Sequence, residues 1–265
     1  RTLATLSATG QPKYQKGFEP MVKGFKFFKY NDIVSVKKLL EELKENNQKA
    51  SGILVEPIQG EGGVIPGDKK FFKELREICN QYNSLLILDE VQSGVGRTGK
   101  MWGYENLEIE PDGFTLAKGL GGGHAIGALL VQKKANIFTP GDHASTFGGN
   151  PFACRAAITV LEEIKRRKIL KNVFERGNQL NEGFTKISAK FPNIISGIRG
   201  LGLIQGLVIN DSYTDAKTIT LKAFDKGLLL VPAGGNVVRF VPPLIISRNE
   251  INILLKKLDL IFEEM

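Results

Sequence analysis

The sequence has little of several residue types and patterns that mark particular classes of protein. Its 265 residues include only two cysteines, Cys79 and Cys154, too few for a disulfide framework, so we expect a reducing, cytoplasmic compartment. Two histidines are too few for a His-rich metal site, and we expect no metal. The longest uncharged apolar runs, 85–88 and 125–131, are far shorter than the ~20 residues of a membrane-spanning helix, so we expect no membrane association.

The net charge is positive, with 36 Lys and Arg residues against 28 Asp and Glu residues, which gives +8. A basic chain can bind nucleic acid, but the cationic residues here are scattered through amphipathic segments and lack interleaved aromatic residues. We therefore expect no nucleic-acid partner. A hydrophobic content of 42% is typical of a soluble globular protein, and the length suits one large domain or two smaller ones.

The first residues do not resemble the beginning of a gene product. The segment from Arg1 to Leu6 has neither the basic and apolar regions of a signal peptide nor an initiating Met. We therefore expect the sequence to begin inside a longer protein.

Strand and helix patterns alternate as far as residue 131. Apolar and aromatic residues predict strands at 24–30, 53–56, 85–89, 113–116 and 126–131. Helical periodicity predicts one helix that begins at Asp32 or Ser35 and runs to about Asn46, and another at 69–82. Leu85–Asp89 is apolar up to its final acid, which is typical of a parallel strand buried on both faces. This order favours an α/β domain with a mostly parallel sheet.

The pattern changes after Pro151. We predict helices at 152–168, 172–190 and 248–264, and between them short strands at 194–199, 203–209, 228–231 and 237–240. The chain is therefore predicted to contain a large α/β part over residues 1–170 and a small α+β domain over residues 171–265.

The segment Gly94–Lys100 satisfies two nucleotide-binding patterns, G-x-G-x-x-G and G-x-x-x-x-G-K. A P-loop needs Ser or Thr after its lysine to hold magnesium, whereas Met101 stands there. No long helix begins at this point, because Trp102 and its neighbours break the pattern, so a phosphate would meet no helix N-terminus. We interpret the segment as a connecting loop.

Asp89 and Lys118 are candidates for a catalytic site. Asp89 ends a predicted strand at the carboxyl edge of the sheet, where α/β proteins bind ligands. Lys118 follows another strand and precedes a run of glycines; burial there would lower its pKa and make it a nucleophile able to form a Schiff base. Taken singly, each residue is more simply a surface acid or a surface lysine. Together they match the needs of pyridoxal phosphate, a Schiff-base lysine and a carboxylate on the ring nitrogen.

Several longer strings support this interpretation, among them ILVEPIQGEGGVIP, LLILDEVQSGVGRTGKMWGYE, TLAKGLGGG, STFGGNPFAC and IRGLGLIQGL. Through them the sequence resembles the class III, fold-type I pyridoxal-phosphate aminotransferases along essentially its whole length. The string GLLLVPAGGNVVRFVPPLIIS is most similar to the acetylornithine aminotransferases of arginine biosynthesis.

The resemblance implies a fold and an activity. Residues 1–170 would be the C-terminal part of the cofactor-binding large domain, and the small domain would follow. The implied reaction is ping-pong transfer of the δ-amino group of N-acetylornithine to 2-oxoglutarate, in a homodimer with shared active sites. Two alternatives stay open. One is another ω-aminotransferase, acting on ornithine, succinylornithine or 4-aminobutyrate; the other is a catalytically incompetent fragment.

The resemblance also implies residue roles on the cofactor side. Lys118 corresponds to the lysine that forms the aldimine and then moves the substrate proton. Asp89 corresponds to the acid on the pyridine nitrogen, Val91 to the side chain against the ring face, and Gln92 to the residue near the phenolic oxygen. Thr146 corresponds to the threonine that reaches the phosphate in the neighbouring subunit.

On the substrate side, Arg239 corresponds to the arginine that binds the substrate α-carboxylate, and Glu61 to the glutamate that pairs with that arginine. We also assign Ser145 to the substrate. His124 stands where relatives often carry proline, and we give it no role. The phosphate-binding loop and the aromatic residue that stacks on the ring are expected upstream of Arg1.

Overall fold

The computed structural model describes residues 2–265, which form two compact units, one ending at Ala50 and the other spanning Ser51–Met265. The first unit contains α1 (Leu3–Ser7), α2 (Pro12–Gln15) and α3 (Ile33–Glu45). α3 begins at Asp32, whose carboxylate accepts the backbone N–H groups of Val34 and Ser35 at 3.1 Å. The strand predicted at 24–30 is wrong, because a strand needs a ladder and this segment contributes to none of the sheets within residues 2–265.

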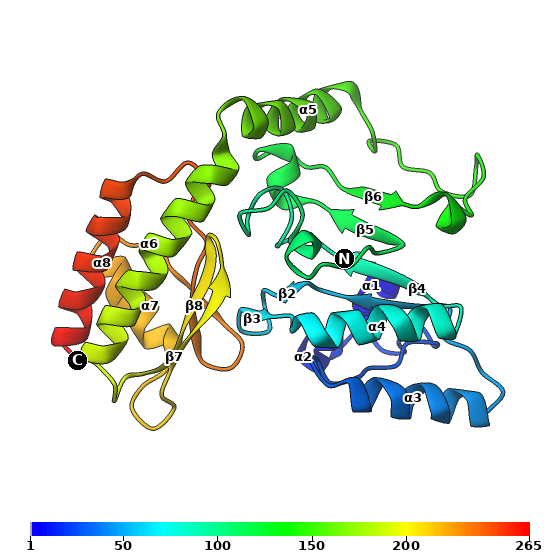
Figure 1. Ribbon diagram of the computed structural model, residues 1–265, viewed down its shortest axis with the longest axis horizontal. Helices are drawn as coiled ribbons and strands as arrows, with labels where there is room; N and C mark the ends of the chain where they lie inside the picture. The colour runs from blue at the N-terminus through cyan, green and yellow to red at the C-terminus, as the bar shows by residue number, and fades with distance from the viewer. Residues whose placement is uncertain (1) are drawn as a thin grey trace. The chain divides into compact units, whose positions relative to one another are not determined.

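The first sheet of the second unit has the order β1-β4-β5-β6. Its strands are β1 (Gly52–Val55), β4 (Leu85–Asp89), β5 (Gly113–Leu116) and β6 (Ala128–Val131). β1, β4 and β5 are parallel, whereas β6 runs antiparallel to β5 (Figure 1). The predicted α/β class with a mostly parallel sheet is confirmed, with β6 as the exception.

The helix that links β1 and β4 is α4 (Lys69–Gln81), and its apolar face explains where it lies. Phe72 and Leu75, one turn apart, are completely buried. The N-terminus of α4 is capped by Asp68, which accepts the backbone N–H of Phe71 at 3.0 Å. The predicted helix at 69–82 is therefore confirmed.

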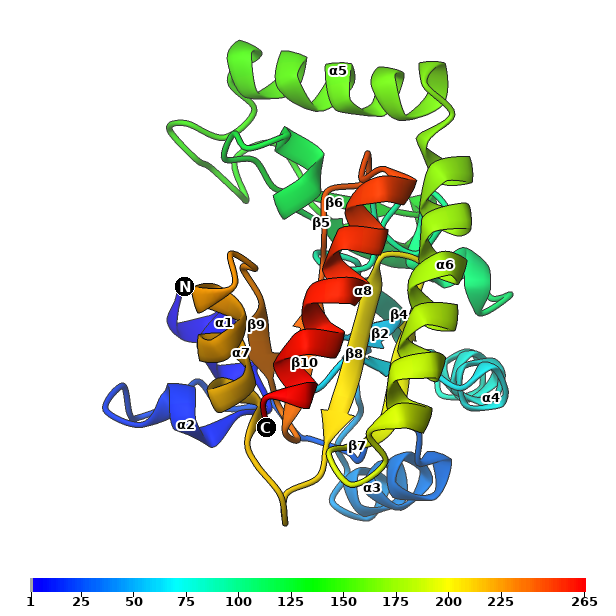
Figure 2. The same ribbon diagram turned by 90° about the vertical axis from the view of Figure 1, so that its left-hand side faces the viewer.

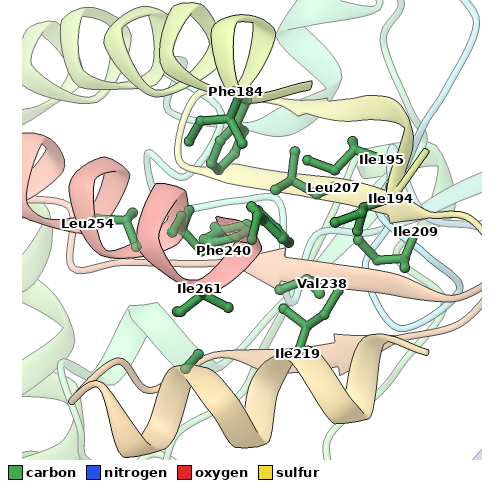
Figure 3. Close-up of a cluster of buried hydrophobic side chains, with 14 of the residues drawn as sticks. Phe184, Ile194, Ile195, Leu207, Ile209, Ile219, Val238, Phe240, Leu254 and Ile261 are labelled. Carbon is green, nitrogen blue, oxygen red and sulfur yellow. The ribbon is translucent and has the colours of Figure 1, made fainter. Parts of the chain in front are cut away.

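The second sheet is antiparallel throughout and has the order β7-β8-β10-β9. Its strands are β7 (Ile195–Leu201), β8 (Ile204–Ile209), β9 (Val231–Ala233) and β10 (Val237–Phe240). Three helices pack against it, α6 (Ile169–Lys190), α7 (Ala216–Asp225) and α8 (Arg248–Glu263), and the views in Figures 1 and 2 show α6 and α8 along the sheet. Figure 3 shows Phe184, Ile219 and Ile261 from these helices gathered around Leu207 and Phe240 of the sheet.

The opposite face of the second sheet packs on a short hairpin, β2 (Ile58–Gln59) and β3 (Ile65–Pro66). Ile58 and Val64 of this hairpin form one buried cluster with Ile204 and Val237. Neighbouring residues of β10 therefore point in opposite directions: Val238 and Phe240 toward the helices, Val237 and Arg239 toward the hairpin.

The loop Gly94–Lys100 joins the two sheets. Nη1 of Arg97 donates to the backbone oxygens of Leu203 at 3.0 Å and Pro242 at 2.5 Å. Burial lowers the pKa of Arg97 to about 10, which still leaves it charged at neutral pH. The interpretation as a connecting loop is confirmed, because Gly94–Lys100 consists of turns and bends and contains no helix or strand.

The C-terminal half contains most of the predicted elements. α5 (Pro151–Arg166), α6 and α8 lie within a few residues of the predicted helices, and β9 is shifted from the predicted 228–231. α7, β2 and β3 were not predicted. None of the helices in residues 2–265 has the length and apolar character needed to cross a membrane. The division into domains at residue 170 stays a prediction.

Asp112 lies between β4 and β5 and provides a test of this packing. Its carboxylate is 1% exposed, and Oδ2 accepts from the backbone N–H of Leu86 and from Nη1 of Arg76, both at 2.7 Å. We expect Asp112→Asn to cost about 3 kcal/mol in the free energy of unfolding, because it leaves the largely buried Arg76 cation without its counter-charge. Urea titration measures the loss.

The pKa of Asp112 also predicts the direction in which the stability changes with pH. Desolvation opposes the charge of Asp112, but hydrogen bonds from Lys134, Leu86 and Arg76 outweigh it and lower the pKa below 3.8. The stability from this group is therefore present above pH 3.8 and is lost as the pH falls through the lower folded-state pKa. The control is Glu163→Gln, which breaks an exposed pair with Arg166 and should leave the midpoint unchanged. If Asp112→Asn and Glu163→Gln lowered the free energy of unfolding by the same amount, the prediction would be contradicted.

Candidate active site

The carboxyl edge of the first sheet fixes the position of Asp89. β4 ends at this residue, and the register pairs it with Thr115 of β5. Asp89 Oδ1 accepts the backbone N–H of Val91 at 3.0 Å and the hydroxyl of Thr115 at 3.3 Å. Within residues 2–265, Oδ2 accepts no hydrogen bond, so one oxygen of an oriented carboxylate is available to a ligand.

Lys118 begins a short 3₁₀ helix, Lys118–Gly121, directly after β5 and Ala117. Its φ is +41°, in the left-handed region that costs a lysine about 1–3 kcal/mol and that is concentrated at functional sites. The sequence predicted a buried lysine; instead the residue is exposed, because it opens onto a pocket of about 700 Å³. The pocket is lined by Lys118, residues 123–127, Phe147 and Gly148.

The pKa of Lys118 is lowered in spite of this exposure. Protein atoms around the amine remove part of its water, and the nearby charge of Arg239 adds to the effect. The carboxylates of Glu61, Asp89 and Glu56 oppose the shift but do not cancel it. More of the amine is therefore neutral at a given pH than in an ordinary lysine.

A second group of site residues meets around Arg239 on β10. Its Nη1 donates to Oε1 of Glu61 at 2.6 Å and to Oε1 of Gln92 at 3.2 Å. Gln92 Nε2 in turn donates to the same oxygen of Glu61 at 2.9 Å. The Arg239 side chain is 8% exposed and that of Glu61 48%, so the arginine is anchored and the glutamate can reach solvent. Nε of Arg239 is buried and has no hydrogen-bond partner.

Glycines allow the loop between β2 and β3 to carry Glu61 to this place. A Cβ at Gly60 would stand 2.3 Å from Oε1 of Gln92. A Cβ at Gly63, where φ is +116°, would stand 2.3 Å from the backbone oxygen of Gly234. Only glycine permits both approaches.

The three-way contact sets the charge of Glu61. Desolvation disfavours its carboxylate form, but the hydrogen bonds from Arg239 and Gln92 are stronger, and the net effect lowers the pKa of Glu61. Glu61 is therefore ionised at neutral pH and neutralises the Arg239 guanidinium.

Glu56, which the sequence analysis did not single out, lies beside these groups. Its Oε2 accepts the backbone N–H of Gly60 at 3.0 Å. Burial, aided by the charge of Asp89, raises the pKa of Glu56 to about 7. A signal was present in the sequence, because Glu56 is an acid that follows an apolar strand just as Asp89 ends the next one.

The remaining predicted residues are not gathered around Arg239. Val91 is half-buried next to Asp89 on the chain. Ser145 and Thr146 lie in an exposed segment, where Ser145 Oγ accepts the backbone N–H of Gly148 at 3.0 Å. The structure brings this segment to the Lys118 pocket only through Phe147 and Gly148. No group of three potential metal ligands was found among residues 2–265.

Comparison with known proteins gives a consistent result. The aminotransferase class-III family model matches residues 1–262. An acetylornithine aminotransferase of Prochlorococcus marinus subsp. pastoris is 98% identical over 265 residues, which are 100% of this chain and 64% of that protein. This chain therefore spans 64% of the length of that curated relative.

Solved structures of aminotransferases are also similar to this chain. The acetylornithine aminotransferase of Elizabethkingia anophelis is 34% identical, with a TM-score of 0.83 over 92% of this chain and 64% of that one. An ornithine aminotransferase of Toxoplasma gondii, described as having partial occupancy of PLP at its active site, is 32% identical, with a TM-score of 0.90 over 99% of this chain and 61% of that one. The chain belongs to the class-III aminotransferases.

Proposed function

We propose that this chain carries the catalytic and cofactor-binding residues of a pyridoxal-phosphate aminotransferase that moves the δ-amino group of N-acetylornithine to 2-oxoglutarate. The observation that carries the proposal is the meeting of Lys118, Asp89 and the Glu61–Arg239 pair around one site. The name of the relative that is 98% identical supports the choice of substrate.

The residues present fit pyridoxal phosphate. The cofactor needs an amine, an acid for its ring nitrogen and an apolar side chain against the ring face. Lys118 offers an amine with a lowered pKa at an open pocket, and Asp89 offers an oriented carboxylate with one oxygen available. Val91 lies next to Asp89 and would contact the ring face, and Gln92 would lie near the phenolic oxygen.

When bound, the cofactor supplies an electron sink for the substrate carbon. Lys118 would hold the cofactor and would then take and return the proton at that carbon, a role that its lowered pKa favours. Asp89 would keep the proton on the ring nitrogen, because Thr115 and the Val91 N–H fix the orientation of its carboxylate.

Arg239 and Glu61 let one pocket accept two different substrates. While Glu61 holds Arg239, the guanidinium is neutralised and the aliphatic amine end of N-acetylornithine can enter. When 2-oxoglutarate arrives, its α-carboxylate takes the place of Glu61 on the planar guanidinium. The 48% exposure of the Glu61 side chain leaves it room to move.

We further propose a cytoplasmic homodimer in which Ser145 and Thr146 act at a shared site, Thr146 on the cofactor phosphate of the partner subunit and Ser145 toward the substrate. Their segment is exposed and lies away from the Arg239 cluster. Cys79 and Cys154 are free thiols, as a reducing compartment maintains them. The small domain over residues 171–265 is part of the same proposal, supported by the second sheet with its three helices.

Cofactor capture by Lys118 tests the proposal. We expect the chain mixed with pyridoxal phosphate to gain an absorption band, and borohydride to fix the cofactor covalently on Nζ of Lys118. Lys118→Ala should lose the label completely and lower any transaminase rate by about 10²–10⁴-fold. Lys100→Ala, an exposed lysine outside the pocket, is the matched control. Absence of label on Lys118, both in the chain and at the same position of the full-length protein, would refute the proposal.

The same experiment separates the alternatives. A label that appears in the full-length protein but not in the 265-residue chain favours the incompetent fragment. A label in both, with ornithine, succinylornithine or 4-aminobutyrate as the best amino donor in single-turnover assays, favours another ω-aminotransferase.

Half-reactions test the roles of Glu61 and Arg239. We expect Glu61→Gln to slow the amino-donor half-reaction by about 10–100-fold, because an uncompensated guanidinium then faces the aliphatic amine, while the 2-oxoglutarate half-reaction is unchanged. Arg239→Lys should do the opposite, because it removes bidentate binding of the carboxylate. Stopped-flow absorbance measures each half separately. Equal losses in both halves for both variants would contradict the two-substrate role.

Complementation tests the shared site. Thr146→Ala and Lys118→Ala should each be inactive or weak alone. In a mixed dimer, one site receives an intact lysine from one subunit and an intact threonine from the other, so activity should return after refolding the mixture. If the mixture is no more active than its components, Thr146 does not act across the interface.

A further inference from the structure

The carboxyl edge of the first sheet carries a second carboxyl group, Glu56, that the proposed function leaves without a role. The parallel register pairs Val55 of β1 with Leu88 of β4. The next residues, Glu56 and Asp89, therefore stand side by side where the two strands end. Val55 and Leu88 are both buried on one face of the sheet, so strand alternation directs Glu56 and Asp89 to the other face.

The charged groups that act on Glu56 come from three neighbouring elements. They are Asp89 on β4, Lys118 after β5 and Glu61 in the loop between β2 and β3. Glu61 is paired with Arg239, so ionising Glu56 would place a second carboxylate beside Asp89, with Lys118 as the nearby cation. Two carboxylates that stand side by side at the partly desolvated edge of the first sheet repel each other, which disfavours the ionised form of Glu56.

Glu56 also has a contact that leads to the substrate side. Its Oε2 accepts the backbone N–H of Gly60 at 3.0 Å. Gly60 directly precedes Glu61 and lies so close to Gln92 that a Cβ there would be 2.3 Å from its amide oxygen. The Glu56 carboxyl group thus fixes the point at which the loop leaves β2, one residue before the partner of Arg239.

We propose that Glu56 is a positioning residue of this active site, which stands uncharged beside Asp89 and holds the turn at Gly60 so that Glu61 meets Arg239. The inference rests on the proposed function. An uncharged Glu56 leaves Asp89 as the only carboxylate charge in its row, available to the ring nitrogen. Burial and the neighbouring Asp89 charge raise the pKa of Glu56 to about 7, so the group is largely uncharged below that pH and ionises as the pH rises through it.

The cofactor-free chain gives the first test. The folded-state pKa of Glu56 lies above its ordinary value of 4.5, so the stability that its proton brings is present below pH 4.5 and is lost as the pH rises through about 7. We expect the thermal midpoint of the wild type to fall relative to that of Glu56→Gln across this range. A difference between the two that does not change with pH would overturn the protonation part of the proposal.

The full-length protein loaded with pyridoxal phosphate gives the second test, through the pH profile of the amino-donor half-reaction. In the wild type we expect the rate to change near pH 7, where Glu56 ionises. Glu56→Gln keeps an acceptor for the Gly60 N–H but cannot ionise, so we expect it to have the wild-type rate below about pH 6 and no change of rate near pH 7. Glu56→Ala removes the acceptor, and we expect it to be about tenfold slower throughout. If Glu56→Gln is as slow as Glu56→Ala, an ionised carboxylate is needed and the proposal fails. A wild-type rate in Glu56→Ala would also overturn it.

Glu90→Gln is the matched control. Glu90 is a buried carboxyl group one residue after Asp89, but it accepts from Ser93, Gly103 and Tyr104 and not from Gly60. We expect Glu90→Gln to lower the stability of the protein and to keep the change of rate near pH 7. If Glu90→Gln also loses that change of rate, its assignment to Glu56 is overturned. If the wild type takes up no cofactor, the proposed function fails, and unfolding of the cofactor-free chain still decides the state of Glu56.

Discussion

The buried guanidinium of Arg239 is the constraint on which the site depends. A cation removed from water is costly unless a counter-charge and hydrogen bonds replace the lost solvent. Glu61 supplies the charge at 2.6 Å although it lies 178 residues away along the chain. To bring it there, the loop between β2 and β3 must pack against Gln92 and the backbone of Gly234, which the glycines of that loop permit. The second sheet and the first are thus joined at the place where substrate would bind.

Around this pair the charges are close to balanced. Lys118 and Arg239 face Asp89 and Glu61, with Glu56 as the fifth ionisable group. The positive charge of Arg239 helps to lower the pKa of Lys118, so under the proposed function the arginine assigned to the substrate also favours the neutral amine. The overall +8 of the chain has no part in this, because the charges that act on Lys118 are the few groups close to it.

The sequence was informative where local pattern and chemistry coincide. The apolar run before Asp89 predicted β4 to the residue, and the amphipathic periods predicted α3, α4 and α8 within one or two. The direction of a strand and its pairing with other strands were harder to predict. β6 has an apolar composition like that of its parallel neighbours, so its sequence does not indicate that it runs antiparallel to β5. The strand predicted at 24–30 had suitable residues but no ladder to join.

The candidate site was also predicted only in part, because some of its residues follow a local pattern and others do not. Lys118 and Asp89 follow strands, and the chemistry of each type suggested its use; the roles of Arg239 and Glu61 came from resemblance alone. The structure adds their contact, and it corrects the expected burial of Lys118, which lies at an open pocket with a strained backbone. Glu56 was missed because its importance comes from the register of β1 against β4, which no single segment of sequence contains.

The site combines fixed groups with one side chain that is free to move. Asp89 is fixed by a strand ladder and two hydrogen bonds, and Arg239 is fixed by burial in β10. Glu61 is the exception, since nearly half of its side chain is exposed on a loop. Under the proposed function, an amine and then a dicarboxylate bind in one place, which requires a group that moves while the reacting groups stay still. The Glu61 side chain is the group of this site that can move, and the hydrogen bond from Gly60 to Glu56 holds the backbone next to it.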